Sequence, residues 1–186
     1  MSDDSLDLLE RALDQTGTLI AGVAPEQHAL PTPCEDWDVA ALVGHVLGGL
    51  DNFTASARGE KPDWAGGRPP VEGDWTDAFA AKAGTLLDTW RAADPEKRPG
   101  ADLLITEQAV HAWDLASATG QPVAALDPAV AERALTWSHG MLKPEYRGAG
   151  GGGAIGAEVP VPDDAPVYAR LAGWFGRDPA PWAQGN

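Results

Sequence analysis

The segment ADLLITEQAVHAWDLASATG, residues 101–120, decides the fold class of this chain. Its apolar residues are Leu103, Leu104, Val110, Trp113 and Leu115. The steps of seven from Leu103 to Val110 and of three from Val110 to Trp113 keep to one helix face. Gly120 and Pro122 follow, and both residue types end helices. The segment therefore predicts a helix from about Ala101 to Ala118.

The same periodicity predicts helices on both sides of this segment. Asp38 and Asp74 stand where a side chain can cap a helix start, and Asp127 precedes a proline at a first helical position. The expected helices cover about 5–23, 38–57, 74–94 and 127–142, with a short one near 166–175. No segment favours a strand. The sequence predicts an all-α protein, a four-helix bundle with an additional short C-terminal helix.

Two segments rich in glycine and proline interrupt this helical pattern. Residues 59–73 form a predicted surface loop, and Gly148–Gly156 is mostly glycine and is expected to be flexible. We therefore assign residues 1–145 to the helix bundle. Residues 146–186 are a glycine-rich connection and a short helical appendage of the same domain.

The charge of the chain limits its partners. The 186 residues carry 13 Lys and Arg against 28 Asp and Glu, a net charge of -15. Nucleic acid and anionic membrane surfaces need a basic footprint, so neither is expected as a partner. No apolar run approaches the roughly 20 residues of a membrane helix, and the N-terminus is acidic where a signal peptide is basic. We expect a cytoplasmic protein. Its eight tryptophans are compatible with a homodimer.

One cysteine excludes an intrachain disulfide and a cysteine-rich zinc site, so histidines are the candidates for chemistry. Glu107 and His111 are four residues apart, and Asp114 continues the same helical row. A buried carboxylate beside a neutral imidazole favours a bound cation, whereas on a helix surface the same pair is an ordinary weak contact. His45 lies beside the apolar stripe of the second helix, where a structural role and a ligand role are both open.

Three motifs together carry a family resemblance. They are PTPCEDWDV (31–39), LVGHV (42–46) and VHAWDLA (110–116). With them the chain resembles the DinB/YfiT-like superfamily, and more closely the metal-binding domain of mycothiol-dependent maleylpyruvate isomerases and their actinobacterial relatives. The C-terminal Gly176–Pro179 is similar to an ending common in that group. The resemblance implies a four-helix bundle that holds a divalent metal ion, usually zinc, with nickel or another divalent ion as alternatives.

The implied ligands are His45, Glu107 and His111. Two imidazoles and one carboxylate leave a coordination position open, as in catalytic zinc sites. A thiol at that position would lose its proton. The resemblance therefore implies a thiol transferase or isomerase, with a mycothiol-type thiol as cosubstrate and an electrophilic substrate. Asp114 is expected to accept a hydrogen bond from a ligand histidine or from nearby backbone.

Two other functions stay open at this point. One is a non-enzymatic metal-binding stress or sensor protein, and the other is a metal-dependent hydrolase, for which Asp114 is the nearest candidate base. The isomerases carry a further C-terminal domain, and no arginine here can be selected to bind a substrate acid. The arginines considered are Arg11, Arg58, Arg68, Arg91 and Arg147. A pocket of several hundred Å³ beside the metal would favour a substrate, and a closed metal would favour a structural role.

Overall fold

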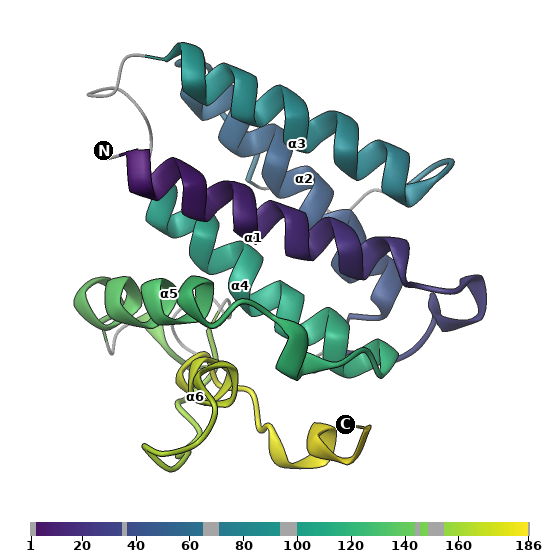
Figure 1. Cartoon of the computed structure of the whole chain (residues 1–186), viewed down its shortest axis with the longest axis vertical. Helices are drawn as coiled ribbons and strands as arrows, with labels where there is room; N and C mark the ends of the chain where they lie inside the picture. The colour runs from purple at the N-terminus through teal and green to yellow at the C-terminus, as the bar shows by residue number, and fades with distance from the viewer. Residues whose placement is uncertain are drawn as a thin grey trace.

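The fold is all-α, as predicted, in a computed structural model that describes residues 3–34, 37–64, 71–93, 100–143, 146–148 and 155–185. Within these ranges the chain forms six α-helices and no strand (Figure 1). The α-helices are α1 (Asp3–Ala21), α2 (Val39–Ala57), α3 (Trp75–Ala92), α4 (Ala101–Thr119), α5 (Pro128–Met141) and α6 (Val167–Trp174). The short 3₁₀ helices are η1 (Pro25–Gln27), η2 (Val123–Ala125) and η4 (Ala180–Gly185).

Capping residues next to the helices define where α2, α3 and α5 begin and where α4 ends. The carboxylates of Asp38, Asp74 and Asp127 each accept a backbone N–H from the first turn of α2, α3 and α5. Gly120 ends α4 in the left-handed conformation with φ 69°, which glycine adopts without strain. These predicted caps are confirmed. The first helix is two residues shorter at its end than predicted, because the chain turns at Gly22.

Four helices form the bundle that positions the site. Helix α1 packs against α3 and α4, and α2 packs against the same two helices. Helix α5 then covers α4 and the edge of α1, and α6 packs on α5 and α4 (Figure 1). Because four helices surround α4, nearly every side chain from Leu104 to Ala116 is buried. Polar groups on α4 must therefore find partners inside the protein.

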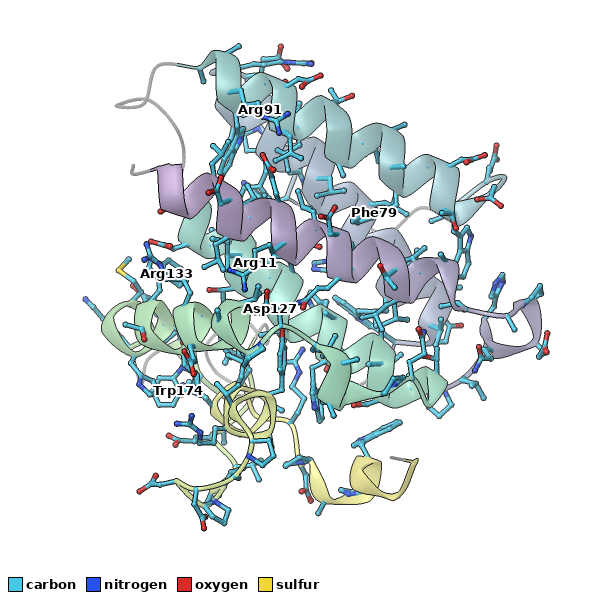
Figure 2. All side chains as sticks on the ribbon, in the orientation of Figure 1. Arg11, Phe79, Arg91, Asp127, Arg133 and Trp174 are labelled. Carbon is cyan, nitrogen blue, oxygen red and sulfur yellow. The ribbon has the colours of Figure 1, made fainter. Side chains whose placement is uncertain are left out.

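Ion pairs join neighbouring helices at the surface (Figure 2). Arg91 of α3 pairs with Glu10 of α1 at 2.5 Å, and Arg11 of α1 pairs with Asp127 at the start of α5. Arg133 of α5 contacts Asp102 of α4 at 2.7 Å. Such exposed pairs contribute about 0–1 kcal/mol each. Apolar packing therefore holds the bundle together.

The C-terminal segment returns to the bundle through tightly packed glycines. Gly176 has φ 83°, and a Cβ atom there would lie 2.6 Å from the Cα of Gly156. The backbone N–H of Val159 donates to the carbonyl of Gly173 at 2.9 Å. This close approach places the next residue, Arg177, against α4.

Parts of two predicted loops lie outside the described residues. These are 65–70 in the predicted surface loop and 149–154 in the predicted flexible glycine stretch. The assignment of 1–145 and 146–186 to bundle and appendage stays a prediction. Among the described residues, no helix is both long and apolar enough to cross a bilayer.

Candidate metal centre

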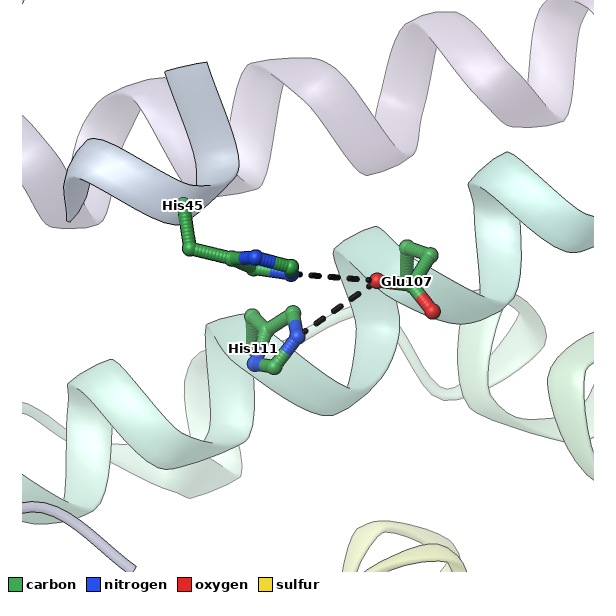
Figure 3. A group of neighbouring side chains, drawn as sticks. All are labelled: His45, Glu107 and His111. Atoms are coloured by element: carbon green, nitrogen blue, oxygen red, sulfur yellow. Dashed lines mark hydrogen bonds and ion pairs between the residues drawn. The ribbon is translucent and has the colours of Figure 1, made fainter. Parts of the chain in front are cut away.

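Three side chains from two helices meet at one point of the bundle (Figure 3). His45 comes from α2, and Glu107 and His111 come from adjacent turns of α4. Glu107 Oε2 lies 3.4 Å from His45 Nε2 and 3.5 Å from His111 Nε2. One donor atom from each of the three residues lies within 4.8 Å of the other two. The predicted convergence of His45 with the Glu107–His111 row is thus present, and their role as ligands stays a prediction.

The spacing of these atoms suits a metal ion better than hydrogen bonds. Ordinary N–H···O bonds are about 2.7–3.2 Å long, shorter than both contacts of Glu107. Two ligands of a tetrahedral ion with bonds of about 2.1 Å stand about 3.4 Å apart. The nitrogen and oxygen donors are also those that zinc accepts. The residues present therefore fit a divalent ion.

A second set of contacts fixes the His111 ring from behind. His111 Nδ1 lies 3.0 Å from Asp114 Oδ2, so it donates to that carboxylate and leaves Nε2 directed at the site. Asp114 is fully buried, and Arg177 donates to both of its oxygens at 3.2 and 3.0 Å. The hydrogen bond from His111 to Asp114 is therefore present, and the role of Asp114 in supporting a metal ligand stays a prediction. The buried charge of Asp114 is neutralised by an arginine from the far end of the chain.

These contacts shift the pKa values of the site. Burial would raise the pKa of Glu107, but the imidazoles of His111 and His45 beside it hold that pKa well below the usual carboxyl range. Burial would lower the pKa of His111, but its bonds to Asp114 and Glu107 raise that pKa to about 9. Burial likewise opposes ionisation of Asp114, yet His111 and Arg177 keep its pKa low. Without a metal, His111 is therefore a cation between two carboxylates at neutral pH.

Trp37 covers one side of both histidines. Its ring centroid lies 4.7 Å from that of His45 and 5.8 Å from that of His111. The loop before α2 holds it there, because Thr32 donates through both its backbone N–H and its hydroxyl to the carbonyl of Trp37. Trp37 thus packs this loop directly on the two candidate ligands.

The other side of the site opens into a pocket of about 80 Å³. The side chains of His45 and Glu107 remain 33% and 40% exposed, so a ligand can reach them from solvent. The pocket is smaller than the several hundred Å³ expected for a whole substrate. The lining residues outside the triad are Val46, Gly48, Gly49, Asn52, Phe53, Asp63, Trp64, Leu104 and Gln108.

Sequence reasoning missed two polar residues of this region. Arg177 was seen only as part of a C-terminal motif, and Gln108 was passed over between two candidate residues. None of the described arginines considered from sequence lines the pocket, and Arg68 lies outside the described residues. His28 lies outside the pocket lining and is half-buried, with its ring stacked on Trp75 at a centroid distance of 3.9 Å.

Comparison with known proteins identifies the family of this chain. The sequence model of the family described as mycothiol maleylpyruvate isomerase N-terminal domain matches residues 9–116. The chain belongs to this family. The matched range contains His45, Glu107, His111 and Asp114 but ends before Arg177.

Two relatives extend the family likeness over almost the whole chain. Both are uncharacterised proteins of Mycobacterium tuberculosis, from strains CDC 1551 / Oshkosh and ATCC 25618 / H37Rv. Each is 32% identical over 191 residues, covering 94% of this chain and 98% of the relative. No solved structure matches the chain.

Proposed function

We propose that this chain binds one divalent metal ion, zinc in the first place, through His45, Glu107 and His111, and that it is a thiol-dependent transferase or isomerase. The cosubstrate is a low-molecular-weight thiol of the mycothiol type, and the other substrate is an electrophile. The observation that carries the proposal is the position of Glu107 Oε2, at 3.4 and 3.5 Å from two imidazole nitrogens in a site open to solvent. Membership of the mycothiol isomerase family supports the choice of thiol.

A divalent ion, when bound, lowers the pKa of a thiol so that the thiolate is present at neutral pH. Its charge of +2 exceeds the single negative charge of Glu107 by one. Asp114 and Arg177 cancel each other, so this residual positive charge remains to attract an anionic sulfur. The sulfur could then add to an electron-poor double bond of the second substrate, whose π electron pair moves onto the electron-withdrawing group and takes up the proton that the thiol released.

The side chains around the triad prepare it for this task. Asp114 holds the His111 tautomer that keeps Nε2 available, and Trp37 excludes water from one side of both imidazoles. The pocket beside Gly48 and Gly49 leaves the opposite side accessible, because a Cβ atom at either glycine would meet nothing within 4 Å. The metal-binding atoms of the triad are thus held in place, and a ligand can approach them from the side of the pocket.

The hydrolase alternative is less well supported. It needs a general base apart from the ligands, and Asp114 was the nearest candidate. Asp114 has no exposed surface, and both of its oxygens are taken by His111 and Arg177. It cannot receive a proton from a water molecule in the pocket. We therefore retain the thiol chemistry as the proposal.

The test is to load the protein with cobalt and add mycothiol. We expect a sulfur-to-cobalt charge-transfer band that is lost in Glu107→Ala and His45→Ala. His139→Ala is the matched control, since His139 is exposed near the end of α5 and should leave the band intact. If cobalt binds and no thiol changes its spectrum, the transferase or isomerase proposal is wrong, and a non-enzymatic or hydrolytic role takes its place.

A further inference from the structure

Trp64 is the most exposed of the large apolar side chains in the described ranges, at 60%, and it lines the pocket beside the triad. A single exposed apolar side chain is common on a protein surface and needs no special reason. Trp64 differs in two ways. Residues of α2 fix its position, and its open ring surface belongs to the pocket that contains the three candidate ligands.

The side-chain amide of Asn52 holds the residue before Trp64 in place. Its Oδ1 accepts the backbone N–H of Asp63 at 2.9 Å, and its Nδ2 donates to the backbone carbonyl of Asp63 at 3.2 Å. Asn52 therefore pairs with both backbone groups of Asp63, as a neighbouring strand would. It lies two turns after His45 on α2. The position of Trp64 is thus set relative to the helix that supplies one candidate ligand.

Phe53 supports the ring of Trp64 from the protein interior. The two ring centroids lie 5.3 Å apart with an angle of 78° between the ring planes, which is a favourable edge-to-face contact. Phe53 itself is only 4% exposed and belongs to the core. A ring held in this way loses little conformational freedom when a ligand covers it, so binding costs less free energy.

The pocket lining indicates which chemical group would cover this ring. It contains two aromatic rings, Phe53 and Trp64, and two carboxylates, Asp63 and Glu107. Among the described residues it contains no lysine or arginine. An anionic group beside Trp64 would therefore meet a carboxylate and no counter-charge. A neutral apolar group, by contrast, would bury its own surface and that of the indole together.

We infer that Trp64 is a specificity-determining residue whose indole ring binds a neutral apolar group of a ligand held at the triad. Asn52 is the positioning residue that keeps the ring there. This inference rests on the metal and thiol chemistry proposed above, and it concerns the part of the ligand away from its reactive atom. A flat ring on the ligand is favoured most, because it adds a ring–ring contact to the burial of apolar area.

The test compares two thiols that differ in one apolar ring, ethanethiol and 2-phenylethanethiol. Each is titrated into the cobalt-loaded protein, and binding is followed by the charge-transfer absorbance. We expect the wild type to bind 2-phenylethanethiol about tenfold more tightly than ethanethiol. Trp64→Ala should reduce this advantage to about threefold or less, with unchanged affinities for cobalt and for ethanethiol.

Two further variants separate recognition from general structural effects. Tyr146→Ala is the matched control, because Tyr146 is an aromatic side chain that is 49% exposed and lies outside the pocket lining. It should keep the full advantage of the phenyl thiol. Asn52→Ala leaves the indole in the chain but removes both bonds to Asp63. It should lose part of the advantage and retain the affinity for ethanethiol.

The charge of the preferred group is tested with two thiols of nearly equal shape. Thiocholine carries a trimethylammonium group where 3,3-dimethylbutane-1-thiol carries a tert-butyl group. A tryptophan ring can bind an organic cation as well as an apolar group. The loss of affinity in Trp64→Ala should be at least as large for the neutral thiol as for thiocholine.

Each outcome supports or overturns the inference. A phenyl advantage that falls in Trp64→Ala and persists in Tyr146→Ala supports it, and an advantage that survives Trp64→Ala overturns it. A larger loss for thiocholine also overturns it, because the ring would then select a cation. Full advantage in Asn52→Ala removes the positioning role of Asn52.

The two thiols also separate this inference from the proposed function. If ethanethiol and 2-phenylethanethiol bind the cobalt-loaded wild type equally, only the role of Trp64 fails. If neither thiol binds, the proposed function fails and this inference with it.

Discussion

Two carboxylates on α4, those of Glu107 and Asp114, flank His111 and differ in their exposure to solvent and in their contacts. Glu107 is 40% exposed and stands 3.4–3.5 Å from two imidazole nitrogens. Asp114, two turns further along, is fully buried and accepts bonds of 3.0–3.2 Å from His111 and Arg177. Asp114 has every partner that a buried carboxylate needs, whereas Glu107 has only long contacts. The protein thus uses one carboxylate to build the site and leaves the other available to a ligand.

The largest expected effect comes from the buried carboxylate. Asp114→Asn leaves Arg177 buried without a counter-charge, and breaking such a pair costs about 3–5 kcal/mol of unfolding free energy. Chemical denaturation of the metal-free protein measures it. Asp102→Asn is the matched control on the same helix, because its pair with Arg133 is partly exposed and should contribute less than about 1 kcal/mol. Equal losses in the two variants would show that the buried pair has no special role.

The more exposed carboxylate should matter mainly for metal binding. Glu107→Gln keeps the shape but removes the negative charge beside His111, so the metal-free protein should lose some stability, though less than in Asp114→Asn, because the Glu107 side chain is 40% exposed. It should abolish the stabilisation by zinc, which for the wild type is about 2.7 kcal/mol at a hundredfold excess over Kd. Thermal melting with zinc and with chelator measures both. A zinc-dependent rise in melting temperature that persists in Glu107→Gln would contradict the assignment of Glu107 as a ligand.

The pH dependence should reverse between the metal-free and the metal-bound protein. The pKa of His111 is raised from 6.5 to about 9, so the stability it contributes is complete below pH 6.5 and is lost as the pH rises through 9. The metal-free wild type should lose on the order of 1–3 kcal/mol over that range. Zinc must displace the proton from Nε2, so its affinity should rise by up to about tenfold per pH unit.

Denaturation in chelator at several pH values measures how the unfolding free energy of the metal-free protein depends on pH. Zinc titrations at the same pH values measure how the zinc affinity depends on pH. The side chain in His111→Gln cannot titrate, so this variant should show neither dependence. A metal-free wild type whose stability does not change between pH 6.5 and 9 would mean that His111 is neutral in the free protein.

The smallest effect is expected from a conservative change at the C-terminal end. Arg177→Lys keeps the charge but loses the two-pronged contact with Asp114. The His111 ring should be held less firmly, and zinc affinity should fall by a few-fold, at most about tenfold. Isothermal titration with zinc measures it. Arg147→Lys, in the same segment but bonded to the carbonyl of Trp174, should leave zinc affinity unchanged.

The sequence predicted those features that depend on neighbours along the chain. The caps at Asp38, Asp74 and Asp127 follow from residues at most three positions away. The row of Glu107, His111 and Asp114 follows from helical spacing alone. By contrast, the meeting of His45 with this row depends on how α2 packs on α4, and only the family resemblance indicated it.

Other features could not be predicted because they depend on long-range packing. Arg177 reaches Asp114 across 63 positions of the chain, past a glycine-rich segment that carries no periodic signal. Leu103 is one of the apolar residues that predict α4, yet it is 40% exposed, because apolar spacing does not reveal which sides of α4 its neighbours cover. The unsatisfied oxygen of Gln108 is a property of packing and has no counterpart in the sequence.

X-ray absorption at the zinc edge tests the central claim most directly, because it reports the atoms around the ion. For the zinc-loaded wild type we predict one ion per chain with two imidazoles and a carboxylate oxygen at about 2.0–2.2 Å. The imidazole signal should fall from two to one in His45→Ala and stay at two in His139→Ala. A shell of oxygen atoms alone, or a spectrum that His45→Ala does not change, would contradict the assignment of this site.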